Sequence, residues 1–291
     1  MAIIFRVLIT VLGAMPACVA ECLASGIGWL STRLPSKRLR LMKRNVDQVL
    51  GLAPHTSFAQ TFYAQVFSSQ IRCLIDTCRG VIWPGSVQIE DGNDWVDLVR
   101  RLESDGRGII FMAAHIGSWE LAANKIAATC SRHVRVLAKR PKVPGGAAAL
   151  EWLRGKSGVS VLWSHKKSLV KDMMSALRKG EHLGMVVDQK PEGRVGDTVQ
   201  FFNRPVAFVT GPASMSLRCD AVIVSVAVVR TGMRRFRLMG RLVFDPRSAR
   251  DLSGEQEAVH VSQLCTDEIE QWIRLYPEQW TWEYKRWIFN T

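Results

Sequence analysis

The chain has 291 residues, and its 39 Lys and Arg against 26 Asp and Glu give a formal net charge of +13. This length suits one sizeable hydrophobic core, and the positive excess indicates a polyanionic partner such as an anionic bilayer, an acidic protein or a phosphorylated substrate. Ten tryptophans and no nucleic-acid-binding motif favour a lipid surface over nucleic acid. Seven scattered cysteines without zinc spacing favour a reducing compartment and argue against a structural metal, and we expect no cofactor.

Residues 1–34 are apolar with few charges and are expected to attach the protein to a membrane. The cleanest apolar run, Val7–Ala20, is short for a membrane span and is interrupted by Pro16. Three interpretations compete: a signal peptide that ends with this run, a marginal membrane helix over about residues 3–30, or a helix lying in the interface. We favour the two anchor interpretations, because apolar residues resume after Glu21 and do not give way to a polar segment.

A basic cluster follows the apolar segment, and the positive-inside tendency places such clusters on the cytoplasmic side of a bilayer. An ordinary solvated helix face is the alternative for this cluster. We therefore expect residues 35–291 to form a single domain that faces the cytoplasm. The cluster consists of Arg33, Lys37, Arg38, Arg40, Lys43 and Arg44.

Hydrophobic spacing predicts two helices, 36–50 and 55–79, with Ser36 as the cap of the first. After Gly80, short apolar runs alternate with amphipathic stretches, a rhythm that indicates strand and helix crossover units. The expected elements are strand 87–89, helix 93–104, strand 108–114, helix 118–129, strand 134–137, helix 146–155, strand 159–162, helix 167–179 and strand 183–187.

The last third of the chain predicts helix 209–219, a hairpin of strands 221–229 and 236–239, and a long helix over about 254–275. The tail, 277–289, is too aromatic for a disordered end. The sequence therefore predicts an α/β fold with a central, mostly parallel sheet flanked by helices, preceded by an N-terminal membrane-anchoring helix.

One short stretch combines groups suited to proton transfer. The apolar strand 108–114 runs directly into His115, Gly117 and Ser118 provide a turn and a helix cap, and Glu120 follows in the first helical turn. In open α/β sheets the active site lies in the crevice beyond the carboxyl ends of the strands. His115 is thus expected at such a site.

From this spacing we expect Glu120 to accept a hydrogen bond from one imidazole nitrogen of His115, leaving the other to take a proton from a hydroxyl. That hydroxyl then attacks a carbonyl, and backbone N–H groups at the helix start stabilise the developing oxyanion. The alternative is a partly buried histidine whose partners are neighbouring backbone groups.

The stretch His115-Ile-Gly-Ser-Trp-Glu120 resembles the His, four residues, acid motif of the glycerolipid acyltransferase superfamily. Glu at its end and Trp before it are similar to the lipid A biosynthesis (lauroyl/myristoyl) acyltransferase family, whose usual form is His-x-Gly-Asn-Trp-Glu. Three further stretches resemble motifs of that family, and the likeness covers essentially the whole chain. They are the strand ending in Asp-Gln at 183–189, the loop and helix start at 199–213, and the tryptophan-rich closing motif at 277–287.

Three positions depart from the family pattern. Ser118 replaces the usual Asn and Asn203 the usual Gly, changes that alter substrate fit without removing a catalytic group. Glu283 stands where the closing motif commonly carries His, so no role is assigned to that position.

The resemblance implies His115 and Glu120 as catalytic residues and direct acyl transfer without a covalent enzyme intermediate. It also implies that five residues bind substrate, although Asp188 is equally suited to capping a strand end and the surface is an alternative for Arg204. These five are Lys139, Arg140, Asp188, Gln189 and Arg204.

The same resemblance implies an acyl carrier protein thioester as donor, a Kdo-bearing lipid A precursor as glycolipid acceptor, and anionic lipids at the cytoplasmic face of the cell inner membrane as further partners. One alternative keeps the two catalytic groups but uses acyl-CoA and another glycolipid, such as a phosphatidylinositol mannoside. The other alternative is an inactive membrane-binding homologue.

Overall fold

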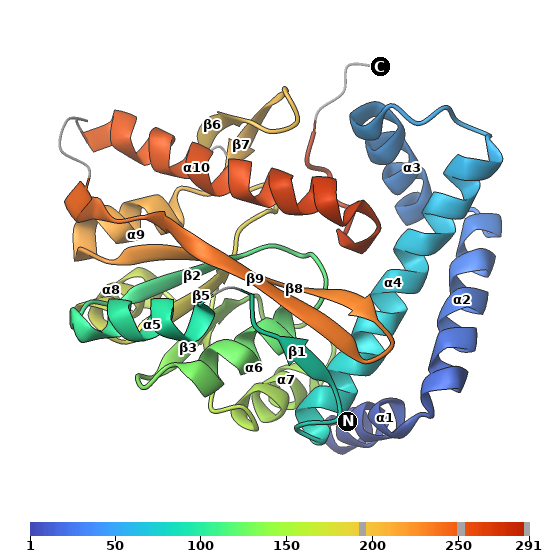
Figure 1. Cartoon of the computed structure of the whole chain (residues 1–291), viewed down its shortest axis with the longest axis horizontal. Coiled ribbons are helices and arrows are strands. Elements are labelled where there is room, and N and C mark those ends of the chain that lie inside the picture. Colours follow the sequence, from blue (N-terminus) through green and yellow to red (C-terminus); the bar gives the residue numbers. More distant parts are fainter. Residues whose placement is uncertain (93, 192–195, 249–253, 288–291) are drawn as a thin grey trace.

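A computed structural model describes residues 1–92, 94–191, 196–248 and 254–287. A central sheet separates two helical layers, with α5, α6 and α7 on one face and α8, α9 and α10 on the other (Figure 1). Helices α1 to α4 gather at one end of the sheet (Figure 1). The α-helices have the bounds α1 Ala2–Ala14, α2 Ala17–Arg33, α3 Lys37–Leu50, α4 Ser57–Ile82, α5 Trp95–Ser104, α6 Trp119–Thr129, α7 Gly146–Gly155, α8 Leu169–Arg178, α9 Gly211–Cys219 and α10 Gly254–Leu275.

The main sheet has seven strands in the order β1-β9-β8-β2-β5-β3-β4. Five of them, β8, β2, β5, β3 and β4, run parallel, and only the β8–β9 pair is antiparallel, because a short turn joins those two strands. A separate hairpin pairs β6 with β7. The strands are β1 Gln88–Glu90, β2 Ile109–Ala113, β3 Val134–Ala138, β4 Ser160–Trp163, β5 His182–Val186, β6 Asp197–Gln200, β7 Pro205–Phe208, β8 Val222–Gly232 and β9 Arg235–Phe244.

Two apolar clusters bury the faces of this sheet. Alternate residues of β2 point to opposite clusters: Ile110 and Met112 pack with α8, α9 and α10, whereas Ile109 and Phe111 pack with α5 and α6. A strand buried on both faces must be apolar throughout, which is why this segment shows no polar alternation. The mostly parallel sheet expected from the sequence is therefore confirmed.

Helix positions also agree with the expected elements, and the side-chain caps are present. Ser36 accepts the hydrogen bond of Leu39 N at 3.0 Å, and Ser118 accepts that of Leu121 N at 3.3 Å. The sequence does not predict the β6–β7 hairpin, since the stretch resembles a loop of the family and each strand is only four residues long. Asn93 and Phe289, the ends of two expected segments, lie outside the described residues.

The N-terminal segment differs from the single anchor helix that was expected. Helices α1 and α2 meet at a bend of 108°, and Pro16 stands at the break, where its ring and missing N–H prevent one continuous helix. Within the described residues, neither helix alone has the length and apolar character needed to cross a membrane; the bent pair meets the test only when taken together, and only by length and composition.

Charged groups tie α2 to the body of the protein. Glu21 forms ion pairs with Arg72 of α4, at 2.7 Å, and with Arg230 of β8. Arg230 also binds Asp76, a buried acid of α4, at 3.0 Å. Because these groups are partly or wholly buried, their pairing fixes how α2 sits on the domain.

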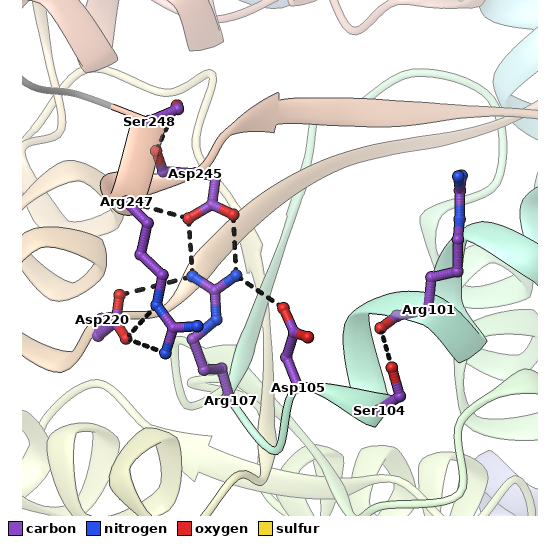
Figure 2. Close-up of polar contacts among 8 residues, drawn as sticks. All are labelled: Arg101, Ser104, Asp105, Arg107, Asp220, Asp245, Arg247 and Ser248. Atoms are coloured by element: carbon purple, nitrogen blue, oxygen red, sulfur yellow. Dashed lines mark hydrogen bonds and ion pairs between the residues drawn. The ribbon is translucent and has the colours of Figure 1, made fainter.

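A second ionic cluster closes the opposite end of the sheet (Figure 2). The buried guanidinium of Arg107, just before β2, binds both oxygens of Asp245 after β9, at 2.7 and 2.8 Å. It also binds Asp105 at 3.1 Å, and Arg247 binds Asp220 at 2.7 Å. These contacts join the starts of β2 and β8 to the end of β9, far from the carboxyl ends where an active site is expected.

Candidate active site

His115 and Asp188 follow two strands that are neighbours in the sheet. Ala113 of β2 pairs with Val186 of β5, so the residues two positions further along each chain emerge side by side at the carboxyl edge. Gly117 then adopts a positive φ of 56°, and a Cβ there would lie 2.2 Å from Val228 O. Only glycine allows this close approach, which turns the chain from β2 into α6.

The Asp188 carboxylate, 1% exposed, is the hydrogen-bond partner of His115. Its Oδ1 lies 2.7 Å from His115 Nδ1, and its Oδ2 accepts bonds from His115 N at 3.0 Å and from Trp280 Nε1 at 2.7 Å. Three donors thus satisfy a carboxylate that burial alone would neutralise. This arrangement makes Asp188 a residue that orients His115.

The second imidazole nitrogen faces Gln189. His115 Nε2 lies 3.3 Å from Gln189 Nε2, an amide nitrogen that can only donate. Nδ1 therefore carries the proton toward Asp188, and Nε2 holds a lone pair. This tautomer is the one that a general base requires.

Burial and charge act in opposite directions on the imidazole. Burial disfavours the imidazolium, but the Asp188 carboxylate outweighs this effect and raises the pKa of His115 above its ordinary value. Burial likewise opposes ionisation of Asp188, yet the His115 charge and the three hydrogen bonds lower the pKa of that carboxyl. Below the raised pKa of His115 the ring is an imidazolium paired with the Asp188 carboxylate, and above that pKa Nδ1 keeps its proton while Nε2 becomes available as a base.

The prediction that Glu120 accepts a hydrogen bond from His115 is wrong. Glu120 instead forms a two-point ion pair with Arg154 of α7, with Nε at 3.0 Å and Nη2 at 2.6 Å. Glu120 is only five positions from His115 in the sequence, but the acid that binds the imidazole is Asp188, which follows the adjacent strand β5. A catalytic role of Glu120 stays a prediction.

A cavity of about 200 Å³ lies beside this pair, between α3, α4, the start of α6 and the C-terminal tail. Trp119 and Tyr284 line it, and their rings also contact the His115 ring at centroid distances of 5.0 and 5.4 Å. The wall further includes Glu120 and Arg38, one charge of each sign. Apolar rings and a few charged groups suit a ligand that carries both lipid and polar parts.

The C-terminal tail supplies groups that the sequence did not assign to the site. Thr281 binds the backbone oxygen of His115 at 3.0 Å through its N–H, while Trp280 holds Asp188. Glu283, to which the sequence assigns no role, accepts from Gln70 of the cavity wall at 3.0 Å. The next residue, Tyr284, contacts the His115 ring. Matching the family's closing-motif His to position 284, one residue later, would have pointed to this side chain.

The remaining predicted substrate-binding residues lie away from the cavity wall. Lys139 and Arg140 are exposed where β3 ends, at the same edge of the sheet as His115 but two strands away. Arg204 is exposed in the β6–β7 turn and donates to Gln48 O at 3.3 Å. Their contact with substrate stays a prediction.

One group of potential metal ligands is present in the described part of the chain, away from this site: Glu103, Cys130 and His182. His182 Nδ1 accepts from Ile109 N at 3.1 Å, and its Nε2 donates to Glu103 Oε1 at 2.8 Å. Both ring nitrogens are therefore engaged by the protein itself. This group stabilises the amino end of β5 and does not offer a free coordination site.

An imidazole and a buried carboxylate at the ends of neighbouring parallel strands are groups suited to proton transfer in an enzyme. The family described as bacterial lipid A biosynthesis acyltransferase matches residues 2–288. The chain belongs to this family and is an acyltransferase of lipid A biosynthesis, a reaction with an acyl donor and a lipid acceptor. A comparison with curated proteins found no significant match.

The geometry predicts which acid controls the titration of His115. Replacing Asp188 by Asn removes the charge that holds the proton, so the pKa of His115 should fall. Replacing Glu120 by Gln should change it far less, because Arg154 already neutralises Glu120. NMR titration of the His115 ring in both variants measures this, and a larger fall in the Glu120→Gln protein would contradict the assignment.

Proposed function

We propose that this enzyme moves a fatty acyl chain from an acyl carrier protein thioester onto a hydroxyl of a lipid A precursor, with His115 as general base. The observation that supports this proposal is the His115–Asp188 pair, whose Nε2 lone pair points toward a donor side chain beside a partly apolar cavity. An acceptor hydroxyl replaces the Gln189 amide as the group that donates to Nε2.

The chemical step then needs no other base. As the acceptor oxygen bonds to the thioester carbonyl carbon, its proton passes to His115 Nε2 and the carbonyl oxygen becomes an oxyanion. When this tetrahedral intermediate collapses, the carbon–sulfur bond breaks, and the leaving thiolate takes the proton back from the imidazolium. Asp188 stabilises the imidazolium between these two events.

The developing oxyanion needs hydrogen-bond donors, and the expected backbone donors are largely engaged. The N–H of His115 binds Asp188, that of Gly117 binds Gln279 O, and that of Ser118 binds Val228 O. These three groups therefore already have acceptors within the protein.

We assign the role of oxyanion hydrogen-bond donor to the Tyr284 hydroxyl. Its side chain lines the cavity and contacts the His115 ring, and it forms a hydrogen bond with Gln189. Burial, followed by the charges of Asp188 and Glu283, raises the pKa of Tyr284, so the phenol stays protonated and able to donate.

The Glu120–Arg154 pair has a positioning role in this proposal. Arg154 Nη1 is buried and has no hydrogen-bond partner in the part of the chain that the structure describes. Arg154 and Trp119 also border a small apolar cavity between α6 and the sheet. Together the pair and the ring lie between this apolar space and the larger cavity that Glu120 lines.

We further propose that the protein sits at the cytoplasmic face of the inner membrane, bound to anionic lipids through α1 and α2. Apolar side chains on these helices are exposed: Ile3 is 73% and Val7 57% exposed, and Trp29, at the end of α2, is 53% exposed. The basic start of α3, with Lys37, Arg38 and Arg40 exposed, adjoins them. Such a surface combines apolar insertion with attraction to anionic headgroups.

His115→Ala should lower turnover by at least the ~10²- to 10⁴-fold associated with loss of a general base, while acceptor binding survives. Cys73→Ala is the matched control, because Cys73 lines the same cavity but burial raises the pKa of its thiol to about 12. Assay of the purified enzyme with acyl carrier thioester and lipid A precursor tests both. Transfer by the wild type only from acyl-CoA to another glycolipid, or no transfer at all, would overturn the proposed function.

Tyr284→Phe removes one hydrogen-bond donor and leaves the ring against His115. We expect kcat to fall by roughly 10²-fold, the low end for loss of an oxyanion donor, with little change in KM. Steady-state kinetics measure the split. A change confined to KM would show instead that Tyr284 only binds substrate.

Membrane attachment through α1 predicts that Val7→Asp/Val11→Asp releases the protein from membranes. Both side chains are exposed, so the fold should tolerate the change. The control, Phe58→Asp/Leu275→Asp, introduces the same charges at exposed apolar positions on α4 and at the end of α10. Flotation with vesicles at high salt separates apolar insertion from screened electrostatics, and equal retention of both variants would contradict this mode of attachment.

A further inference from the structure

The outward side of α8 carries positive charges around an apolar centre. Val170 is 54% exposed in the middle of this surface, although the opposite side of the same helix is buried in the core. The surface, here called the α8 face, consists of Lys166, Lys167, Val170, Lys171, Met174, Arg178 and Lys179.

The positive charge of the α8 face exceeds the negative charge around it, although Glu181 interacts with Lys179. Residues 164–179 contain five Lys or Arg and a single acid, Asp172. That acid is half-buried, accepts from Ser168 at 2.8 Å and interacts with Arg135 on β3. The five cations are all exposed to solvent.

The α8 face begins at the same edge of the sheet as the active site. Ser164 N, directly after β4, donates to Ala138 O at 2.8 Å, so the loop before α8 emerges beside the end of β3. From β2 to β4 there are three strand spacings, which amount to roughly 14 Å between His115 and this loop along the edge. A group held on a flexible arm can cover such a distance.

We propose that the α8 face docks the acidic protein that carries the acyl thioester. The inference rests on the proposed function, since it names the surface that receives that donor. An exposed valine with five cations on the same surface matches a protein interface with an apolar centre and a charged rim. A bilayer is the less suitable partner, because the larger exposed apolar surface lies on α1 and α2, and α2 and α8 occupy opposite ends of the molecule (Figure 1).

The experiment compares two donors with the full-length enzyme. Lys166→Glu/Lys167→Glu/Lys171→Glu should raise the KM for acyl carrier protein at least tenfold and leave kcat nearly unchanged, since like charges now repel the carrier. The same variant should use a small acyl-pantetheine thioester with wild-type kinetics, because that donor does not contact the surface.

The control, Arg100→Glu/Arg101→Glu/Arg235→Glu, makes the same change in net charge on α5 and β9, near the opposite edge of the sheet. It should leave the KM for the carrier close to that of the wild type. If the α8 variant proves unstable in a thermal melt, Lys167→Gln/Lys171→Gln should still raise the carrier KM in the same donor-specific way.

Three results would overturn the docking assignment. These are an unchanged carrier KM, an equal loss with both donors, and a loss of vesicle binding in place of carrier binding, which would mark the α8 face as a lipid surface. Wild-type enzyme that transfers acyl groups from neither donor would instead refute the proposed function, so the two failures are distinguishable.

Discussion

The buried carboxylate of Asp188 is the interaction on which the active-site end of the molecule depends. A charge this deeply buried is stable only when donors surround it, and its donors come from the turn after β2 and from the C-terminal tail. Satisfying one anion therefore requires that β2, β5 and the tail all reach their final places. The orientation of His115 is a consequence of this requirement.

Aromatic packing holds the tail in that place. The rings of Trp280, Trp282 and Trp287 contact one another and the two phenylalanines that follow β6. Arg286, buried beside them, donates to Ala207 O in β7 at 3.0 Å. The β6–β7 hairpin, unrecognised as a pair of strands from the sequence, thus serves as the surface on which the tail closes. Most tryptophans near the site support the core, and Trp29 on α2 is one that remains exposed.

Hydrophobic periodicity was sufficient to predict nearly every helix and every strand of the main sheet, since each buried face requires apolar residues at its own spacing. It also predicted that His115 lies at the carboxyl end of β2, because a polar residue directly after an apolar strand can be recognised in the local sequence. The acid that binds His115 could not be predicted in this way. Asp188 lies 73 positions further along the chain, and only the strand order makes β5 the neighbour of β2. Glu120 is the nearest acid to His115 in the sequence, but in the folded protein it forms an ion pair with Arg154.

The position of the tail in the chain has a consequence for biosynthesis. Residues 279–284, which hold Asp188 and His115 in place, leave the ribosome after every strand of the sheet, whereas α1 and α2 leave it first. Domains form as the chain emerges, so the surface proposed to bind the membrane is available long before His115 is aligned. A nascent chain would therefore reach the bilayer while His115 and Asp188 are still unaligned, so that membrane binding precedes assembly of the site.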